Sequence, residues 1–299
     1  MKAVSGRAGR FLVGLAPYAW LVLFFLIPFL IVFKISLSEA RMGIPPYMPL
    51  VEWADGAVAQ WHISLAGYGA LFSDDLYALA YLSSLRLAAI ATIGCLLLGY
   101  PAAYAIARSP GHVRQPLLML VALPFWTSFL IRVYAWIGIL KNEGLLNMAL
   151  QALGIIDEPL QILETDWAVS IGMIYSYLPF MILPLYATLE KMDLSLLEAA
   201  ADLGCKPFKA FLAVTLPLSM PGIIAGSMLV FIPAVGEFVI PDLLGGPDTL
   251  MIGKVLWAEF FDNRDWPAAS AVAVAMLVVL VVPIMAFQHF ETKRAEREG

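Results

Sequence analysis

A single carboxylate interrupts a strongly apolar stretch in the last quarter of the sequence. Residues 230–242 read VFIPAVGEFVIPD and place Glu237 just after Pro233 and Gly236. Proline and glycine at these positions are expected to bend or end a helix. If the stretch crosses a bilayer, a charge within it costs about 2.5–3.5 kcal/mol, so such a side chain usually faces protein or water. Three interpretations remain open: Glu237 faces a polar path through the protein, pairs with Arg132, or reaches the outer water.

Aromatic side chains offer a second kind of contact for a cation, because the face of a ring attracts positive charge by about 0.5–2 kcal/mol. Packing, or an aromatic belt at a membrane interface, is the other explanation for any single ring. Tyr175 and Tyr177 are two positions apart in one predicted helix, so at most one of them is expected to line a path. The candidate path residues are Glu237, Asp242, Phe125, Trp126, Tyr134, Tyr175 and Tyr177.

A second stretch contains residues that typically begin and end short helices. Residues 192–222 read MDLSLLEAAADLGCKPFKAFLAVTLPLSMPG. Asp193 is a good N-cap for a short helix over 194–203, Gly204 can end it in the left-handed conformation, and Pro207 can begin a second short helix. The apolar residues of the first helix form one stripe at helical spacing: Leu196, Leu197, Ala200 and Leu203. This apolar stripe either packs against the protein or the membrane surface, or docks a cytosolic partner.

Composition indicates that these residues belong to a membrane protein. The 299 residues are 61% hydrophobic and 14% charged, with a mean hydropathy of +0.84. A soluble domain is about a quarter charged. A spanning helix needs about 20 mainly apolar residues. Six windows meet this requirement, and the prediction is an all-α, polytopic membrane protein with six transmembrane helices. The windows are 12–36, 84–108, 116–140, 167–189, 217–237 and 267–289.

Charge gives the orientation of these spans. Most of the 18 Lys and Arg residues fall on one side, which is therefore predicted to be cytoplasmic and to hold both termini. Most of the 23 Asp and Glu residues fall on the other side. They are either solvated loop residues or the source of a field that favours cations near an outer mouth.

The motifs of an enzyme are missing from the sequence. Gly253-Lys254 resembles the end of a phosphate loop, but Val255 replaces the required Ser or Thr. No spacing indicates a metal centre, a nucleophile–base pair or a nucleic-acid surface. We therefore expect no catalytic residues, no bound metal and no cofactor on this chain. If it moves a solute uphill, the energy comes from another chain or from an ion gradient.

Residues 192–222 carry a resemblance to a known family. Glu198-Ala199-Ala200, then Gly204, then Val214-Thr215-Leu216-Pro217 resembles the EAA signature of permease subunits of bacterial ABC importers, with Val214 in place of the usual Ile. In that family the loop is the coupling helix that fits a cleft in a cytosolic ATPase. The resemblance therefore implies these ATPase-coupling residues: Glu198, Ala199, Ala200, Asp202, Gly204, Leu216 and Pro217.

The resemblance extends over most of the chain. Residues 123–144, 229–246 and 251–271 look like polyamine-importer permeases, and most like the first permease of a putrescine system. It implies a type I importer (MetI-like) fold in the bacterial inner membrane. The implied division is 1–83 for a first helix and periplasmic loop, 84–289 for the permease core with coupling helices within 193–214, and 290–299 for a cytoplasmic tail.

The same resemblance implies the partners and the energy source. These are a second, homologous permease, two ATP-binding subunits that hold ATP and Mg²⁺, and a periplasmic polyamine-binding protein. The expected function is one half of an ATP-driven path for polyamines, putrescine above all. Two alternatives remain: the same architecture with another small cationic solute, or an ion-gradient secondary transporter, which inverted repeats would favour. Arg132 is the candidate for a structural or gate ion pair.

Overall fold

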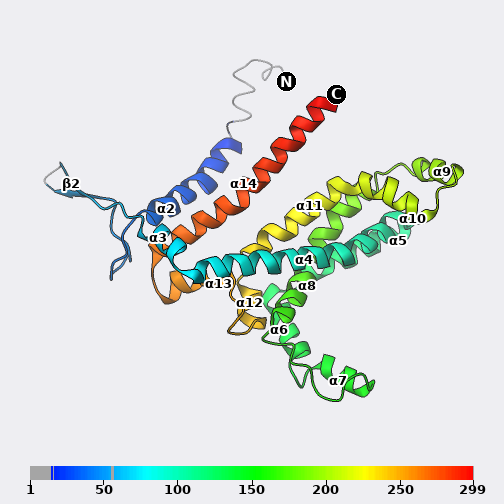
Figure 1. Ribbon diagram of the computed structural model, residues 1–299, viewed down its shortest axis with the longest axis horizontal. Coiled ribbons are helices and arrows are strands. Elements are labelled where there is room, and N and C mark those ends of the chain that lie inside the picture. Colours follow the sequence, from blue (N-terminus) through cyan, green and yellow to red (C-terminus); the bar gives the residue numbers. More distant parts are fainter. Residues whose placement is uncertain (1–14, 16, 55–56, 299) are drawn as a thin grey trace. The chain divides into compact units, whose positions relative to one another are not determined.

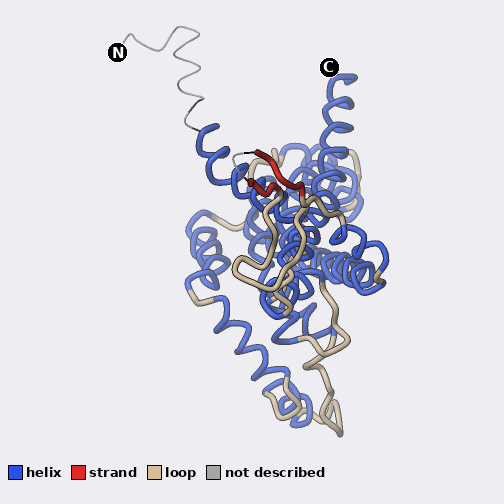
Figure 2. The backbone as a smooth tube through the Cα atoms, turned by 90° about the vertical axis from the view of Figure 1, so that its left-hand side faces the viewer, coloured by secondary structure: helices blue, strands red, loops and turns tan. Residues whose placement is uncertain are grey.

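The computed structural model describes residue 15, residues 17–54 and residues 57–298. The start of the first predicted span and the basic side chains of the predicted cytoplasmic tail lie outside this description. Helices make up most of the described chain, and one short hairpin accompanies them (Figure 2). The all-α prediction is thus confirmed for the body of the protein, whereas the hairpin, β1 (Val51–Ala54) with β2 (Ala57–Trp61), was not predicted.

The chain folds into two compact units. One comprises residues 1–78 and 255–299, and the other comprises residues 79–254. The second unit holds all the candidate residues of both sites. The predicted boundary at residue 83 is a division by family domain, and it stays a prediction.

The first unit pairs the two ends of the chain. A helix over Pro17–Ser36 includes a π-helical segment, η1 (Val22–Leu26), and α2 (Ile27–Ser36). It is followed by the antiparallel hairpin and by α3 (Ala66–Ser73). The long helix α14 (Trp266–Glu298) follows a π-helical turn, η4 (Ala258–Asp262), and packs along α2 and α3 (Figure 1).

The second unit is a bundle arranged around α8 (Asp166–Leu189), of whose most apolar stretch 61% is buried. Helix α11 (Leu216–Val235) packs along α8, and α12 (Val239–Leu244) packs on both α8 and α6. The other elements of this unit are α5 (Gly111–Ala122), the 3₁₀ turn η2 (Leu123–Trp126), α6 (Phe129–Leu140), α7 (Leu145–Ala152), α9 (Ser195–Asp202), α10 (Pro207–Ala210) and the π-helical turn η3 (Phe211–Thr215). The two boundaries between the units fall inside α4 (Asp75–Arg108) and α13 (Ile252–Trp257), so most of α4 and the first half of α13 belong to this unit.

Two glycines let α11 approach α8 closely. A Cβ atom on Gly222 would lie 2.6 Å from Thr188 Oγ1, and one on Gly226 would lie 2.8 Å from Met181 Sδ. Small residues four apart permit this approach in membrane helices. In this structure the two glycines therefore serve the packing of α11 on α8 within the chain.

Four helices of the described chain are long and apolar enough to cross a membrane, and a bent pair makes a fifth. The apolar helix Trp266–Val281 coincides with the sixth predicted window. The prediction was wrong about the third window, 116–140, as one continuous helix. The chain breaks at Thr127 and Ser128, and the helical segments on either side differ in direction by 91°. Extended backbone at both residues interrupts the helix, and Pro124 just before them favours a short 3₁₀ turn.

Candidate functional site

The loop between α8 and α10, residues 190–206, contains the short helix α9 and is here called the EAA loop. Asp193 Oδ1 accepts a hydrogen bond from the backbone N–H of Ser195 at 3.0 Å. This bond lowers the pKa of the Asp193 carboxyl below its usual value. The predicted capping function is therefore present, but Leu194 occupies the cap position and α9 begins at Ser195. The predicted helix over 194–203 is one residue too long at each end.

The end of α9 follows the predicted glycine stop. Gly204 has a φ of +76°, a conformation that glycine adopts without steric cost. The N–H of Gly204 donates to the carbonyl of Ala201 at 2.8 Å, and the N–H of Cys205 donates to the carbonyl of Ala200 at 2.9 Å. These are the two bonds of a Schellman motif, which satisfies carbonyls at the helix end and turns the chain sharply.

The EAA loop presents apolar side chains to the outside. Leu203 is 87% exposed and Leu196 is 45% exposed. Glu198 and Asp202 are also exposed. A short helix with exposed leucines and acids among small alanines has the composition of a docking surface. Leu196 and Leu203 therefore keep much of their surface uncovered by the described chain, and the choice between the membrane surface and a cytosolic partner stays open.

The second half of the loop region differs from the prediction of two short helices. Pro207 begins α10, as predicted, but the helix then continues through η3 into α11 without a stop, from Pro207 to Val235. Leu216 and Pro217 lie where η3 passes into α11, inside this continuous helix rather than in a loop. The wider π-helical turn η3 precedes this proline.

Glu237 lies in the break between α11 and α12. Its Oε2 accepts a hydrogen bond from the hydroxyl of Tyr177 on α8. Its Oε1 accepts bonds from the backbone N–H groups of Val239 at 3.0 Å and Ile240 at 3.4 Å. The carboxylate therefore caps α12 and ties this helix to α8. The predicted bend in the fifth span is confirmed as a helix end at Val235.

Arg132 does not pair with Glu237, the partner that the sequence offered. Its guanidinium carbon lies 5.7 Å from the centre of the Phe129 ring and 6.0 Å from that of Phe125. Its Nε and Nη1 atoms are buried and have no hydrogen-bond partner among the described residues. The positive charge is therefore held against aromatic faces beside the break in the third predicted span.

The aromatic candidates fall into two groups. Phe125 packs on Phe180 with ring centres 5.1 Å apart, and Phe180 lies 6.3 Å from Tyr177, so these rings connect Arg132 to Glu237 through side chains. Tyr175 instead packs against Trp136 at 5.4 Å, which confirms that it does not share a face with Tyr177. Trp126 and Tyr134 are 77% and 58% exposed.

Asp242 lies one turn into α12 and is half-exposed, with Oδ1 at 3.7 Å from Lys254 Nζ. Within the second unit, α9 and α10 lie at one end and α6, α7 and α12 lie at the other (Figure 1). The EAA loop and the helix break at Glu237 therefore occupy opposite ends of α8 and α11.

Sequence reasoning missed Phe180 and Phe129, which complete the ring cluster. Each is an ordinary phenylalanine in an apolar run, so its type carries no signal. Their roles depend on contacts across helices, and only the three-dimensional arrangement reveals those contacts.

Comparison with known proteins gives one family. A profile described as "Binding-protein-dependent transport system inner membrane component" matches residues 11–296. The spermidine/putrescine transport system permease protein PotB of Haemophilus influenzae is 42% identical over 287 residues, covering 96% of this chain and 95% of that protein. The PotB protein of Escherichia coli K12 is 41% identical over 268 residues, covering 90% and 92%.

Solved structures agree on the fold. The crystal structure of a bacterial ABC transporter involved in the import of alginate contains a chain that is similar with a TM-score of 0.68 at 17% identity, over 95% of this chain and 94% of that one. At this identity the similarity extends to the fold alone.

Proposed function

Because this chain belongs to the family of binding-protein-dependent transport system inner membrane components, we propose that it is a permease subunit of an importer for polyamines, with putrescine as a principal solute. The chain is a multi-pass inner-membrane protein and a transport subunit, and ATP hydrolysis takes place on a partner subunit. The single observation that carries the proposal is the EAA loop, an exposed short helix ended by Gly204 at the family spacing.

The proposed partners follow from the two ends of the second unit. An ATPase subunit, which holds ATP and Mg²⁺, receives the EAA loop around Glu198 and Gly204. A second permease contributes the other half of the path, with an ATPase subunit of its own below it. A periplasmic binding protein delivers the solute at the end that carries α6, α7 and α12. The distribution of Lys and Arg supports this orientation and, by the same rule, a cytoplasmic position for both termini.

The proposed path uses the rings that this chain leaves exposed. Trp126 and Tyr134 are available to the methylene groups and ammonium ends of a diamine, which aromatic faces attract. Glu237 adds negative charge at the helix break, where it is half-buried and held by Tyr177. Asp242 lies close by in sequence and adds a second carboxylate.

Uptake by the reconstituted complex tests the solute assignment. Proteoliposomes that hold the two permeases and the ATPase subunits, with binding protein outside, are assayed with putrescine, spermidine and cadaverine, and with an anionic solute as control. ATP-dependent uptake of putrescine that spermidine reduces by competition is the expected result. Uptake that runs on an ion gradient without ATP would contradict the proposal, and uptake of another cation alone would replace the solute but keep the class.

Charge reversal at Glu198 tests the coupling assignment. Because Glu198 is exposed on α9, Glu198→Lys should leave the membrane fold intact and weaken binding of the ATPase subunit. The measurement is co-purification with the ATPase, and Glu158→Lys is the matched control, since Glu158 is exposed in the loop between α7 and α8. Normal co-purification of Glu198→Lys would remove the coupling assignment.

A further inference from the structure

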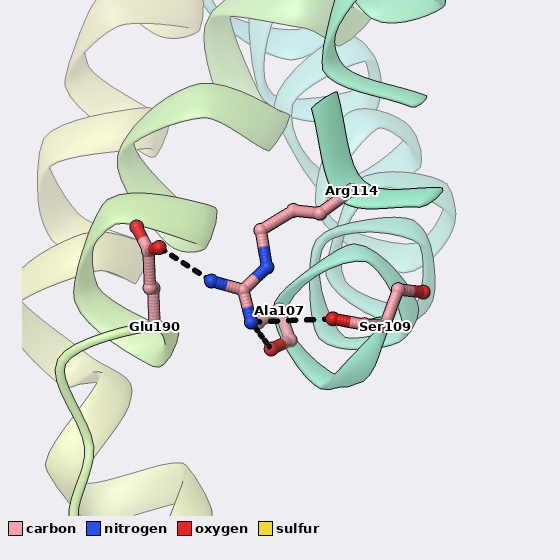
Figure 3. A network of polar contacts seen from close by, with 4 residues as sticks. All are labelled: Ala107, Ser109, Arg114 and Glu190. Atoms are coloured by element: carbon pink, nitrogen blue, oxygen red, sulfur yellow. Dashed lines mark hydrogen bonds and ion pairs between the residues drawn. The ribbon is translucent and has the colours of Figure 1, made fainter. Parts of the chain in front are cut away.

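One guanidinium joins the ends of three helices beside the EAA loop. Arg114, in the first turn of α5, donates from Nη1 to Glu190 Oε1 at 2.6 Å (Figure 3). Its Nη2 donates to the carbonyl oxygens of Ala107 and Ser109, each at 3.2 Å. Ala107 lies in the last turn of α4, and Glu190 is the C-cap residue of α8. The side chain therefore connects α4, α5 and α8 through three polar contacts.

The charges explain why an arginine stands here. The C-terminal end of a helix carries partial negative charge, so Glu190 at the end of α8 is unfavourable without a nearby cation. Arg114 supplies that cation and also satisfies two carbonyls where α4 ends. Its planar fork reaches several acceptors at once, and a lysine ammonium at the same position would not reproduce this geometry. The side chains are 28% and 39% exposed, so water screens the pair in part.

The place of Glu190 in the chain links this network to the EAA loop. Helix α9 begins at Ser195, so a tether of four residues separates its first residue from Glu190. A displacement of α9 by a docked partner therefore acts first on the C-terminal end of α8. Helix α11 moves together with α8 because the two helices are in close contact at Gly222 and Gly226.

We propose that Arg114 is a positioning residue that makes α4 and α5 follow α8 when the EAA loop is displaced. The proposal rests on the proposed function, in which the EAA loop receives the movement of an ATPase. In this proposal Arg114 acts through the three helices that it joins. It determines how much of the movement at α9 reaches the helices on the far side of α8.

The readout is the amount of solute taken up per ATP hydrolysed by the full reconstituted complex. Arg114→Gln and Glu190→Gln should each lower this ratio by about two- to tenfold, while the subunits still co-purify and ATP is still hydrolysed. Arg114→Lys keeps the charge but loses the fork, so its ratio should lie between those of Arg114→Gln and the parent protein. Arg86→Gln is the matched control: Arg86 Nη1 lies 3.6 Å from Asp166 Oδ2 and joins the same two helices, α4 and α8, at the first residue of α8.

The charge swap separates pairing from general damage. Arg114→Glu combined with Glu190→Arg should raise the ratio above that of Arg114→Glu alone, because an opposite-charge pair between α5 and α8 is restored. The ratio should stay below the parent value, because a carboxylate cannot donate to the carbonyls of Ala107 and Ser109. An unchanged ratio in Arg114→Gln, an equal loss in Arg86→Gln, or no recovery in the swap would overturn the proposal. Loss of coupling in Arg114→Gln together with normal ATPase binding by Glu198→Lys would instead contradict the proposed docking site. If Arg114→Gln fails to assemble, a parental ratio in Arg114→Lys overturns the proposal.

Discussion

The hydroxyl of Tyr177 is the group whose removal tests the helix break at Glu237 most directly. Tyr177→Phe keeps the ring, which is 9% exposed, and removes the donor to Glu237 Oε2. The carboxylate keeps its two backbone N–H donors on α12 and loses its tie to α8. Hydrogen bonds to charged groups contribute about 1.5–3 kcal/mol. Because Glu237 is half-buried and water can replace part of the bond, we expect the lower end of this range.

The assay is thermal unfolding of the purified complex in detergent. A loss of 1 kcal/mol shifts Tm by about 2–4 °C in domains of roughly 150–250 residues, and on that scale Tyr177→Phe should lower Tm by roughly 3–6 °C. Tyr175→Phe is the matched control for stability, since Tyr175 lies on the same helix and contacts Trp136 through its ring. In a Glu237→Gln background the Tyr177→Phe change should cost less, because the bond to a charge is already gone. A Tm change no larger than that of the control would refute the argument.

Two further predictions concern packing and docking. Gly222→Ala should lower the free energy of unfolding by about 1–3 kcal/mol, because the new Cβ would meet Thr188 Oγ1 at 2.6 Å and the carbonyl of Pro184 at 3.0 Å. Gly138→Ala, with nothing within 4 Å of its Cβ, is the control and should be neutral or stabilising in the same Tm measurement. Leu203→Ser, at a side chain 87% exposed, should leave Tm within about 1 °C and weaken ATPase binding in co-purification; normal binding would show that Leu203 is not part of the docking surface.

Hydropathy located the helices because the cost of exposing backbone to lipid allows few alternatives to a helix. The EAA loop could also be predicted in detail, because a capping residue, a glycine that ends a helix and a proline that begins one each affect only the few residues next to them in sequence. The break at Thr127 and Ser128 was missed because an apolar run of sufficient length gives the same average whether the backbone continues or turns. Pro124 was the available signal, and it is compatible with either course.

Contacts between residues far apart in the sequence could not be predicted, for a different reason. Tyr177 and Glu237 are 60 positions apart, and Arg114 and Glu190 are 76 apart. Each of these residues has several plausible partners on apolar helices, as the open choice between Arg132 and a solvated Glu237 illustrates. Which partner is met depends on how the helices rotate about their axes, and periodicity in a membrane segment that is apolar on all sides carries little information about this rotation.

Because the helix from Pro207 to Val235 is unbroken, an inserted residue has different effects inside it and beside it. A helix rises about 1.5 Å per residue, and each added residue rotates the residues beyond it by about 100° about the axis. An insertion between Gly204 and Pro207 would be absorbed by the turn there. The same insertion within η3 would rotate α10 relative to α11 by about 100° about the helix axis. This stretch of chain must therefore preserve the rotation of its residues about the helix axis more strictly than its length.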